Sequence, residues 1–264
     1  MIKFFRKIRY SLMEKNKTGK YFKYAIGEIV LVVIGILIAL SINNWNQTRV
    51  NHNYVSLILK EIYYDLSDDY EIIYEGIEPR LKIKQLGVEK IKEVMLKGES
   101  PSDSTFMSYY SAMKQGFNLT QSTGSFESLK NGGLDKIKND SLRTKLLEFY
   151  ESDIPRSTTF ITERDNLIEE YTQILEADLF NYKFMTGNDS INQHVMYPKN
   201  NAFINHQSLH KIYEMLSDDT KQKNFRLKEL KRRYQDIMNL IEEELKKREI
   251  HFEYLDTTKL KRDY

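Results

Sequence analysis

One apolar segment near the N-terminus constrains this chain more than any other feature. Between Ala25 and Ile42 the single charged residue is Glu28, and there is no proline. A helix over residues 24–42 would be about 28 Å long at about 1.5 Å per residue, close to the hydrocarbon thickness of a bilayer. The sequence therefore predicts a transmembrane helix over residues 24–42.

Basic residues are concentrated just before this segment. Residues 1–42 contain eight Lys or Arg against two Glu, whereas residues 43–264 contain 32 basic and 36 acidic side chains. By the positive-inside rule we expect a cytoplasmic N-terminus and a large C-terminal portion outside the cytoplasm. The slight acidity of that portion argues against nucleic acid as a partner.

A cleaved signal peptide is the alternative to a permanent anchor. Ala39-Leu40-Ser41 has the small-x-small pattern of a cleavage site. However, the basic region before the apolar run is long, and the run exceeds the usual length of about 7–15 residues. We therefore expect the anchor to be retained, and a mature N-terminus near Ile42 would contradict this.

The composition and the apolar spacing both favour helices. Gly and Pro are scarce, with 11 and 4 residues, and the absence of cysteine excludes disulfides. Apolar residues recur at steps of three and four. The most regular row, typical of a bundle seam, is Leu227, Leu230, Tyr234, Ile237, Ile241 and Leu245. We expect an all-α protein, in which a single transmembrane helix continues into a stalk and an antiparallel helical bundle.

Four regions are expected along the chain. They are a basic cytoplasmic N-terminus (1–23), the transmembrane helix (24–42), an extracytoplasmic helical domain (43–250) and a charged tail (251–264). Within the helical domain, Pro79 and Pro155 are expected to kink or restart helices.

The later part of the helical domain carries three further predictions. A second apolar row is expected to face the core: Phe160, Leu167, Tyr171, Ile174, Ala177 and Leu179. Residues 181–204 lack periodicity and are expected to form a long loop. A short helix is expected over residues 207–216, and Asp218 or Asp219 is then expected to cap a separate helix.

Small residues follow one face of the predicted transmembrane helix. Gly35 and Ala39 are four residues apart, and Gly27 lies two such steps before Gly35. This pattern lets another helix approach closely, so we expect Gly27, Gly35 and Ala39 to pack against a partner helix. Glu28 has two interpretations that remain open, a side chain that reaches the headgroups or one that pairs with a partner within the membrane.

Two runs of the chain resemble a known family. They are residues 24–46 (YAIGEIVLVVIGILIALSINNWN), preceded by residues 1–9 (MIKFFRKIR), and residues 126–143 (FESLKNGGLDKIKNDSLR). They resemble a family of single-span membrane proteins of the Bacteroidota that is known as a domain of unknown function. The resemblance implies an inner-membrane protein with a periplasmic helical domain. It implies no activity, cofactor or catalytic residue.

No constellation of catalytic residues is recognisable. His206 and His210 have the spacing of two metal ligands on a helix, but no Glu follows His206 and no third ligand is identifiable. We interpret them as a solvated or core-edge pair. The acidic pairs Asp68-Asp69 and Asp218-Asp219 are interpreted as surface charges or caps, because adjacent side chains do not share a helix face. We therefore expect no enzyme, no cofactor and no metal.

The leading hypothesis is a membrane-anchored interaction or scaffold protein. Its partners would be the membrane and another protein, or a second copy held through the membrane helix and the bundle. The alternative is an extracytoplasmic ligand-sensing bundle that signals through a partner membrane protein. A cavity of a few hundred Å³ between the helices would favour the alternative.

Overall fold

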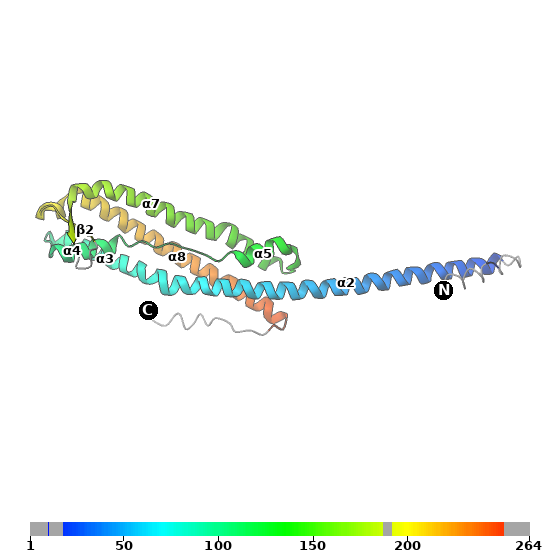
Figure 1. Cartoon of the computed structure of the whole chain (residues 1–264). Coiled ribbons are helices and arrows are strands. Elements are labelled where there is room, and N and C mark those ends of the chain that lie inside the picture. Colours follow the sequence, from blue (N-terminus) through cyan, green and yellow to red (C-terminus); the bar gives the residue numbers. More distant parts are fainter. Residues whose placement is uncertain (1–9, 11–17, 187–191, 251–264) are drawn as a thin grey trace. The chain divides into compact units, whose positions relative to one another are not determined.

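The computed structural model describes residue 10, residues 18–186 and residues 192–250. The expected charged tail (251–264) and most of residues 1–17 therefore lie outside the described residues. The structure is 85% helical, which confirms the all-α class. The elements in chain order are α2 (Thr18–Glu71), η1 (Ile72–Ile77), α3 (Glu78–Lys97), α4 (Asp103–Met113), α5 (Gly124–Gly133), η2 (Leu134–Lys136), α6 (Asp140–Glu148), η3 (Phe149–Asp153), α7 (Ile154–Leu179), β1 (Phe180–Thr186), β2 (Asn192–Pro198), η4 (Asn201–Asn205) and α8 (Gln207–Lys247) (Figure 1).

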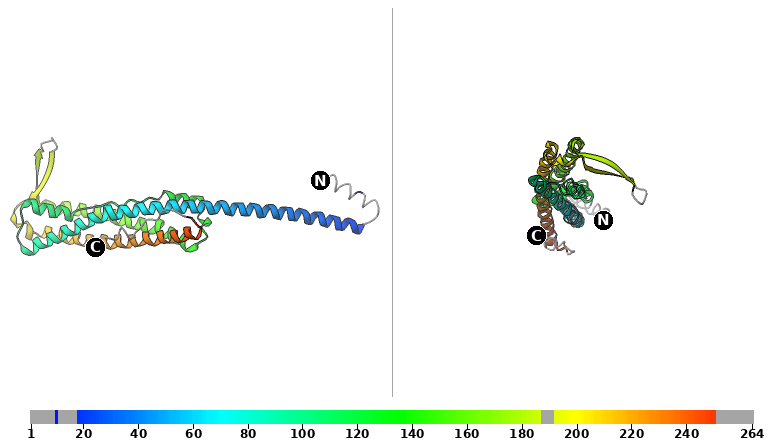
Figure 2. Two further views of the ribbon diagram at one scale, coloured as in Figure 1. Left: turned by 90° about the horizontal axis from the view of Figure 1, so that it is seen from below. Right: turned by 90° about the vertical axis from the view of Figure 1, so that its left-hand side faces the viewer.

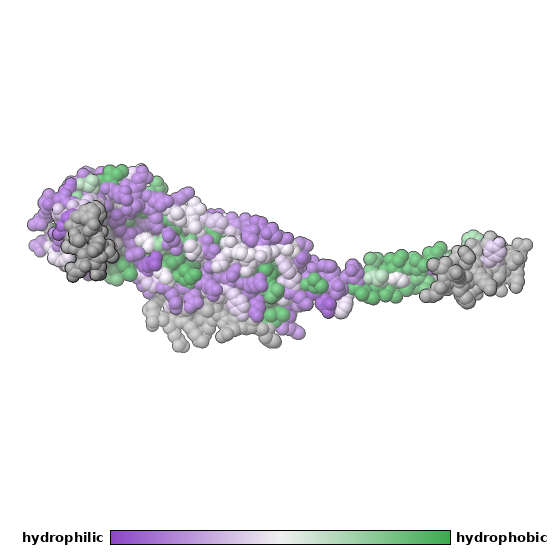
Figure 3. Space-filling view, viewed as in Figure 1, coloured by the Kyte–Doolittle hydropathy of each residue, from purple (hydrophilic) through white to green (hydrophobic). Residues whose placement is uncertain are grey.

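The chain divides into two compact units, residues 1–55 and residues 56–264. In its described part, the first unit consists mainly of the N-terminal portion of α2. The large apolar side chains between Ile26 and Ile42 are 47% to 68% exposed, and Figure 3 shows this portion as an apolar surface. Among the described residues, one helix is long and apolar enough to cross a membrane, and it contains this segment.

Within the second unit, α8 runs antiparallel to α7 and to the segment formed by the end of α2 and α3. Polar pairs that cross between these helices, in order along α8, are Asp219 with Lys84, Lys223 with Asp165, Lys231 with Glu78, Arg233 with Asp153, and Glu242 with Tyr63. Along α7 with η3, and along α2 with α3, the residue number of the partner decreases as the residue number on α8 increases. This order shows that α8 runs in the opposite direction to both. Figure 1 shows α7 and α8 side by side.

The predicted seam of α8 forms much of the core. The six seam residues from Leu227 to Leu245 are at most 3% exposed, which confirms their predicted burial. A second part of the core contains the aromatic rings of Phe106, Tyr110, Phe180 and Phe203. The rings of Phe106 and Phe203 meet edge to face, with their centroids 4.6 Å apart.

The regular α-helix is interrupted before both predicted breakers, Pro79 and Pro155. The preceding turns, η1 and η3, are π-helical. The two bonds that close them span five residues and run from Glu78 N–H to the Ile73 carbonyl and from Ile154 N–H to the Phe149 carbonyl. Proline lacks an N–H, and its ring clashes with the carbonyl four residues earlier, so a wider turn ahead of it relieves the clash.

The long loop predicted over residues 181–204 is wrong. Strands β1 and β2 pair antiparallel, with Phe180 opposite Pro198 and Tyr182 opposite Met196, and η4 follows them. Figure 2 shows the hairpin extending away from the helices of the second unit. The strand signal was short, because the alternation of Phe180, Tyr182 and Phe184 with polar residues covers only five positions.

The predicted break near Asp218 and Asp219 is also wrong. Helix α8 continues through both residues, from Gln207 to Lys247. Asp219 is 0% exposed and lies among cationic side chains. Because those cations compensate its charge, Asp219 is accommodated in the interior of a continuous helix and caps nothing.

The apolar row predicted for the buried face of α7 is largely exposed. Leu167, Tyr171 and Ile174 are 55%, 57% and 64% exposed. The face turned inward is one residue further along, where Ile168 and Leu175 are half-buried against the core and Thr172 is fully buried. A shift of one residue corresponds to about 100° around a helix.

Candidate functional site

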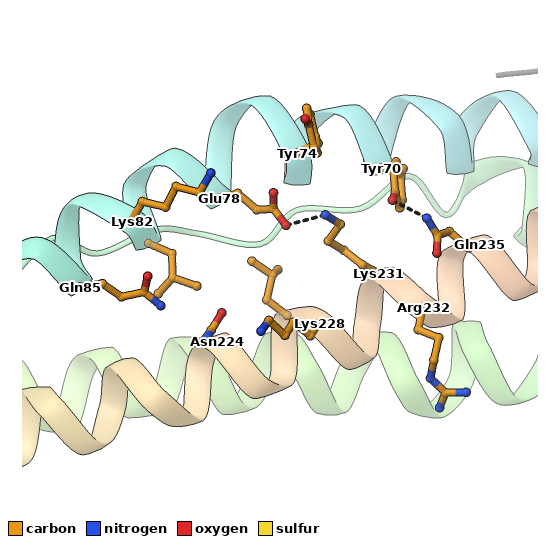
Figure 4. A pocket seen from close by; sticks show the side chains of 12 residues that line it. Tyr70, Tyr74, Glu78, Lys82, Gln85, Asn224, Lys228, Lys231, Arg232 and Gln235 are labelled. Carbon is orange, nitrogen blue, oxygen red and sulfur yellow. Dashed lines mark hydrogen bonds and ion pairs between the residues drawn. The ribbon is translucent and has the colours of Figure 1, made fainter. Parts of the chain in front are cut away.

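A groove of about 490 Å³ lies between α8 and the wall formed by the end of α2, η1 and α3. We call it the tyrosine–lysine groove. Its lining consists of Tyr70, Tyr74, Glu78, Leu81, Lys82, Gln85, Asn224, Leu227, Lys228, Lys231, Arg232 and Gln235. Figure 4 shows Glu78 and Tyr70 of one wall meeting Lys231 and Gln235 of the other, whereas the Arg232 side chain points away from the facing wall. Volumes of about 300–1,000 Å³ are typical of small-molecule sites.

Lys231 is held in place at the centre of the groove. It forms an ion pair with Glu78, and its Nζ atom lies 5.6 Å from the ring centroid of Tyr70 and 5.1 Å from that of Tyr74. The Gln235 side chain donates a hydrogen bond of 2.7 Å to the Tyr70 hydroxyl (Figure 4). These contacts hold the Tyr70 ring and the Lys231 ammonium group in place, because the Tyr70 hydroxyl and the ammonium group each have a polar partner.

The helix geometry around η1 explains why tyrosine reaches this groove. Tyr74 lies within the π-helical turn that Pro79 imposes, and Glu78 closes that turn through its N–H. A π-helical turn inserts one extra residue, which rotates the residues that follow relative to those before. Such turns are frequent at functional sites.

Beside the groove, a cluster of charges is buried between α3, α7 and α8. The Asp219 carboxylate lies 3.0 Å from Lys84 Nζ and 3.1 Å from Lys223 Nζ, and it accepts a 3.0 Å hydrogen bond from Arg164 Nε. Lys223 also pairs with Asp165. Lys84 and Lys223 are 1% and 0% exposed, so these lysines depend on Asp219 to compensate their charge.

A second cavity, of about 350 Å³, borders this buried cluster. Lys84 lines it from α3, Lys114 from the segment after α4, and Asp165 and Glu169 from α7. Burial lowers the pKa of Lys84 below its ordinary value of 10.5, and Asp219 opposes that shift. This cavity presents both signs of charge, and two of its cations are already paired, Lys84 with Asp219 and Lys114 with Glu169 and Glu176.

Asp69 forms another buried polar cluster. It accepts hydrogen bonds from the Ser122 backbone N–H at 3.0 Å, from the Ser122 hydroxyl at 3.1 Å and from the Tyr234 hydroxyl at 3.3 Å. Burial raises the pKa of Asp69, although the bonds from Ser122 oppose this. Burial also raises the pKa values of Tyr150 and Tyr234, whose deprotonated forms would repel Asp69.

In each acidic pair, one aspartate is buried and is therefore not the surface charge or cap that we predicted. Asp69 is 2% exposed and Asp219 is 0% exposed, whereas Asp68 is exposed and the Asp218 side chain is 57% exposed. Neighbouring residues on a helix point about 100° apart, so the first member of each pair faces solvent and the second faces the core.

The residues predicted to pack in the membrane all lie on the N-terminal portion of α2. Gly27, Gly35 and Ala39 are exposed, and a Cβ atom added to either glycine would meet nothing within 4 Å. A helix could therefore approach this face closely. Their role in helix packing stays a prediction.

The two histidines with metal-ligand spacing have different positions. His206 caps α8, because its Nδ1 atom accepts a 3.2 Å hydrogen bond from the Ser208 N–H. His210 lies exposed on the first turns of α8. Among the described residues, no group of three or more His, Cys, Asp or Glu side chains could hold a metal ion.

Sequence reasoning missed the tyrosine–lysine groove. Its walls are separated by more than a hundred residues of chain, and Lys228, Lys231 and Arg232 look like ordinary solvated charges beside the seam of α8. The one available signal was Pro79, which marks the irregular turn in the facing helix.

No curated protein and no solved structure matches the chain. Residues 28–161, which form one wall of the groove but not the α8 wall, match the family of unknown function DUF6090. Because this match covers half of the chain, the protein belongs to the DUF6090 family.

Proposed function

We propose that this protein is a single-pass inner-membrane protein of the Bacteroidota type, with its N-terminus in the cytoplasm and a periplasmic helical domain that docks a protein partner. The apolar portion of α2 has the length of a membrane span, and the basic residues before it set the orientation. No catalytic activity is part of this proposal.

The observation that carries the docking function is the exposed apolar row on α7. Leu167, Tyr171 and Ile174 follow one face at steps of four and three, and each is more than half exposed. Contiguous exposed apolar side chains mark interaction surfaces, and tyrosine is enriched among the residues that contribute most to binding.

A photo-cross-linking amino acid at position 171 tests this docking surface. In native membranes we expect a discrete cross-linked species from position 171 and none from position 162, an exposed threonine on the opposite side of α7, nine residues before Tyr171. Replacing Leu167 and Ile174 by serine should abolish the cross-link. Equal cross-linking from positions 162 and 171 would contradict a specific surface.

The orientation can be tested directly because the chain contains no cysteine. We expect a membrane-impermeant maleimide to label Asn53→Cys on intact spheroplasts, and to label Ser11→Cys only after the membrane is opened. The reverse pattern would contradict the orientation. Release of the intact chain by alkaline carbonate would contradict the anchor itself.

A second copy of the chain is one partner that the membrane helix would accommodate. If the face containing Gly35 and Ala39 packs against its equivalent, Gly35→Cys should form a disulfide-linked dimer under mild oxidation. Leu37→Cys, which points to the opposite side of the helix, should not. Dimers from Leu37→Cys alone would place the contact elsewhere.

Ligand sensing is the second candidate function, and the tyrosine–lysine groove favours it. The groove has the volume of a small-molecule site, an aromatic floor and convergent polar groups. A ligand bound there would contact α3 and α8 together and bias how they pack. A screen by saturation-transfer NMR on the full chain tests it: binding of several compounds that compete with one another supports a shared site.

A further inference from the structure

The solvent side of α2 and η1 carries exposed apolar side chains among acidic ones. Leu57, Tyr64 and Ile72 are 41% to 59% exposed. The exposed charged residues in the same stretch are all acidic: Glu61, Asp68, Glu71 and Glu75. We call these seven residues the acidic face. Because exposed apolar side chains that recur along one side of a helix mark an interaction surface, we expect another segment to cover this face.

The acidic face is hollowed around Ile72. A shallow depression of about 460 Å³ lies there, and it is lined by Asp68, Glu71, Ile72, Glu75 and Gly76. Three of these five side chains are carboxylates and one is a large apolar group. The depression therefore suits an apolar side chain that has basic residues on both sides of it in the sequence.

The end of α8 lies about level with Leu57, where the acidic face begins. The Tyr63 hydroxyl donates a 2.9 Å hydrogen bond to Glu242, and α8 runs antiparallel to α2. Arg248, which follows the last residue of α8, is about as far beyond Glu242 as Leu57 is before Tyr63. The chain that leaves α8 therefore starts at this end of the acidic face.

The turn after α8 changes the direction of the chain. Glu249 has a φ of 60°, in the left-handed region, and the Ile250 N–H donates a 3.1 Å hydrogen bond to the Leu245 carbonyl. These are the features of a Schellman motif, which ends a helix. A residue other than glycine is costly in this region, so the turn is held by its surroundings. The following residues consequently do not continue along the axis of α8.

Residues 251–264 have the composition and the reach to cover the acidic face. Their basic side chains are concentrated around Leu260: Lys259, Lys261 and Arg262. Ile72 lies about 22 Å along the helix from Leu57, at about 1.5 Å per residue. From Ile250 to Leu260 an extended chain spans up to about 33 Å, so Leu260 can reach Ile72.

Charge and distance argue against other pairings. A second copy that packed through the same face would place like charges together, and an anionic membrane surface would repel the face. Tyr171, in the exposed row of α7, lies about 54 Å along the bundle from the end of α8, because Arg164 pairs with Asp219. Leu260 cannot reach that row.

We propose that residues 251–264 fold back and bind to the acidic face. Leu260 occupies the depression at Ile72, and the three basic side chains around Leu260 pair with the three carboxylates of the depression. Burial of the apolar side chains stabilises the contact, and the exposed ion pairs mainly set its register. The bound segment holds the end of α8 against α2. This contact is independent of the α7 docking surface and of ligand sensing in the tyrosine–lysine groove.

Disulfide formation between introduced cysteines tests this contact, because the chain has none of its own. In the full chain in phosphatidylcholine nanodiscs, we expect Ile72→Cys with Leu260→Cys to form a disulfide within one chain under mild oxidation. The readouts are faster migration without reductant and linked peptides in mass spectrometry. Arg232→Cys with Leu260→Cys is the matched control and should form far less. Arg232 is exposed about 24 Å from the end of α8, so Leu260 could reach it equally well.

A charge swap tests the ion pairs. Glu71→Lys with Glu75→Lys should slow formation of this disulfide several-fold, because the basic run then meets like charges. Adding Lys261→Glu with Arg262→Glu should restore the rate. Added NaCl should slow the reaction of the unswapped chain.

Maleimide labelling of Ile72→Cys alone gives a second measurement. We expect labelling to be about tenfold slower than in a chain whose three basic residues around Leu260 are replaced by glutamine, the change that several exposed ion pairs together produce. Glu170→Lys with Glu214→Lys reverses two exposed carboxylates outside the acidic face and should leave the labelling rate unchanged. All these positions of the described chain are exposed, so the fold should be retained.

Four results would overturn the inference. A disulfide that links two chains would show that the segment binds a second copy. Equal disulfide formation by the Ile72 and Arg232 pairs would show that no face is preferred. No disulfide, together with unchanged labelling after the glutamine replacements, would show that the segment does not bind the helices. A disulfide that forms in phosphatidylcholine but not in nanodiscs containing phosphatidylglycerol would assign the basic run to the membrane surface.

Discussion

Helices α7 and α8 pack against each other, but they bury their apolar residues differently. In α8, the row from Leu227 to Leu245 faces the core and is at most 3% exposed. In α7, the row of Leu167, Tyr171 and Ile174 faces solvent, and a more polar row containing Thr172 and Glu176 faces inward. Apolar spacing therefore predicted the orientation of one helix about its axis and not that of the other.

Charge pairs between α7 and its neighbours explain the difference. Near its middle, Arg164 and Asp165 pair with Asp219 and Lys223 of α8. Near its end, Glu176 accepts hydrogen bonds of 2.7 Å from both the Tyr110 hydroxyl and Lys114 Nζ. Turning α7 to bury Leu167 and Tyr171 would break these pairs and leave charges buried alone, which is more costly than exposing three apolar side chains.

The largest expected effect comes from breaking the charge cluster that sets this orientation. Asp219→Ala leaves Lys84 and Lys223 buried without their shared carboxylate, so we expect the free energy of unfolding to fall by about 3–5 kcal/mol. Its exposed neighbour provides the control, because Asp218→Ala should cost less than about 1 kcal/mol. Thermal and urea unfolding of the full chain in detergent, followed by circular dichroism, measures both. Equal losses would contradict the central role of Asp219.

The second prediction compares one leucine from each helix. Leu230→Ala on α8 removes a side chain that is 2% exposed, and we expect a loss of about 2–5 kcal/mol from lost burial and the cavity left behind. Leu167→Ala on α7 removes one that is 55% exposed, so the change should stay within about 0.5 kcal/mol. A large loss from Leu167→Ala would show that the α7 row is buried in the assembled protein.

The third prediction concerns the inward polar face of α7. Glu176→Gln keeps the shape of the side chain but removes the charge that Lys114 contacts, so we expect a loss of about 1–3 kcal/mol. Glu170→Gln, at an exposed position of the same helix, should change stability by less than about 0.5 kcal/mol. If the two variants are equally stable, Glu176 does not fix the orientation of α7.

The fourth prediction is a pH dependence that arises from Asp69. Because burial raises the pKa of Asp69 in the folded protein, the folded state keeps a proton that the unfolded chain has already lost. Stability should therefore fall as the pH rises from the unfolded value, near 4, through the raised folded pKa. Asp69→Asn should remove this slope, and Asp68→Asn should retain it. A wild-type slope of the opposite sign would contradict the raised pKa.

The smallest effect on stability is expected on the exposed row of α7. Tyr171→Ser and Ile174→Ser should each change the free energy of unfolding by less than about 0.5 kcal/mol, because both side chains are already more than half exposed. If the row is a docking surface, Ile174→Ser should nevertheless reduce the cross-link from position 171, and Tyr171→Ser should reduce the cross-link from a photo-cross-linking residue placed at position 174. Retained cross-linking with either variant would separate the exposed row from docking.

Local features of the fold were predictable where a single stretch of chain decides them. Asn139 caps α6 by accepting a 3.2 Å hydrogen bond from the Leu142 N–H, and Gly98 ends α3 in the left-handed conformation. Asparagine before a helix and glycine after one are residue types that these positions prefer. The β-hairpin was missed because its two strands specify each other across a turn, whereas each strand alone is short and weakly patterned.

The candidate site was not predictable from the sequence. The tyrosine–lysine groove exists because α3 and α8 lie side by side, and its cations come from positions that would be ordinary surface charges on isolated helices. The burial of Lys84 and Lys223 was not predictable either, because lysine side chains are usually exposed. Lys84 of α3 depends on Asp219 of α8, and Lys223 depends on Asp219 of its own helix and on Asp165 of α7.

The sequence by itself determined that the chain is helical, that residues 25–42 form a largely apolar helix, and that residues 227–245 form a helix with one buried seam. These properties follow from local helix propensity and from the spacing of the apolar residues, which decides how much of a helix surface is apolar. Only the tertiary structure decided which face of α7 turns inward, which member of each acidic pair is buried, and where a groove opens. Each of those choices depends on the energy of pairing charges from distant segments in a medium of low polarity.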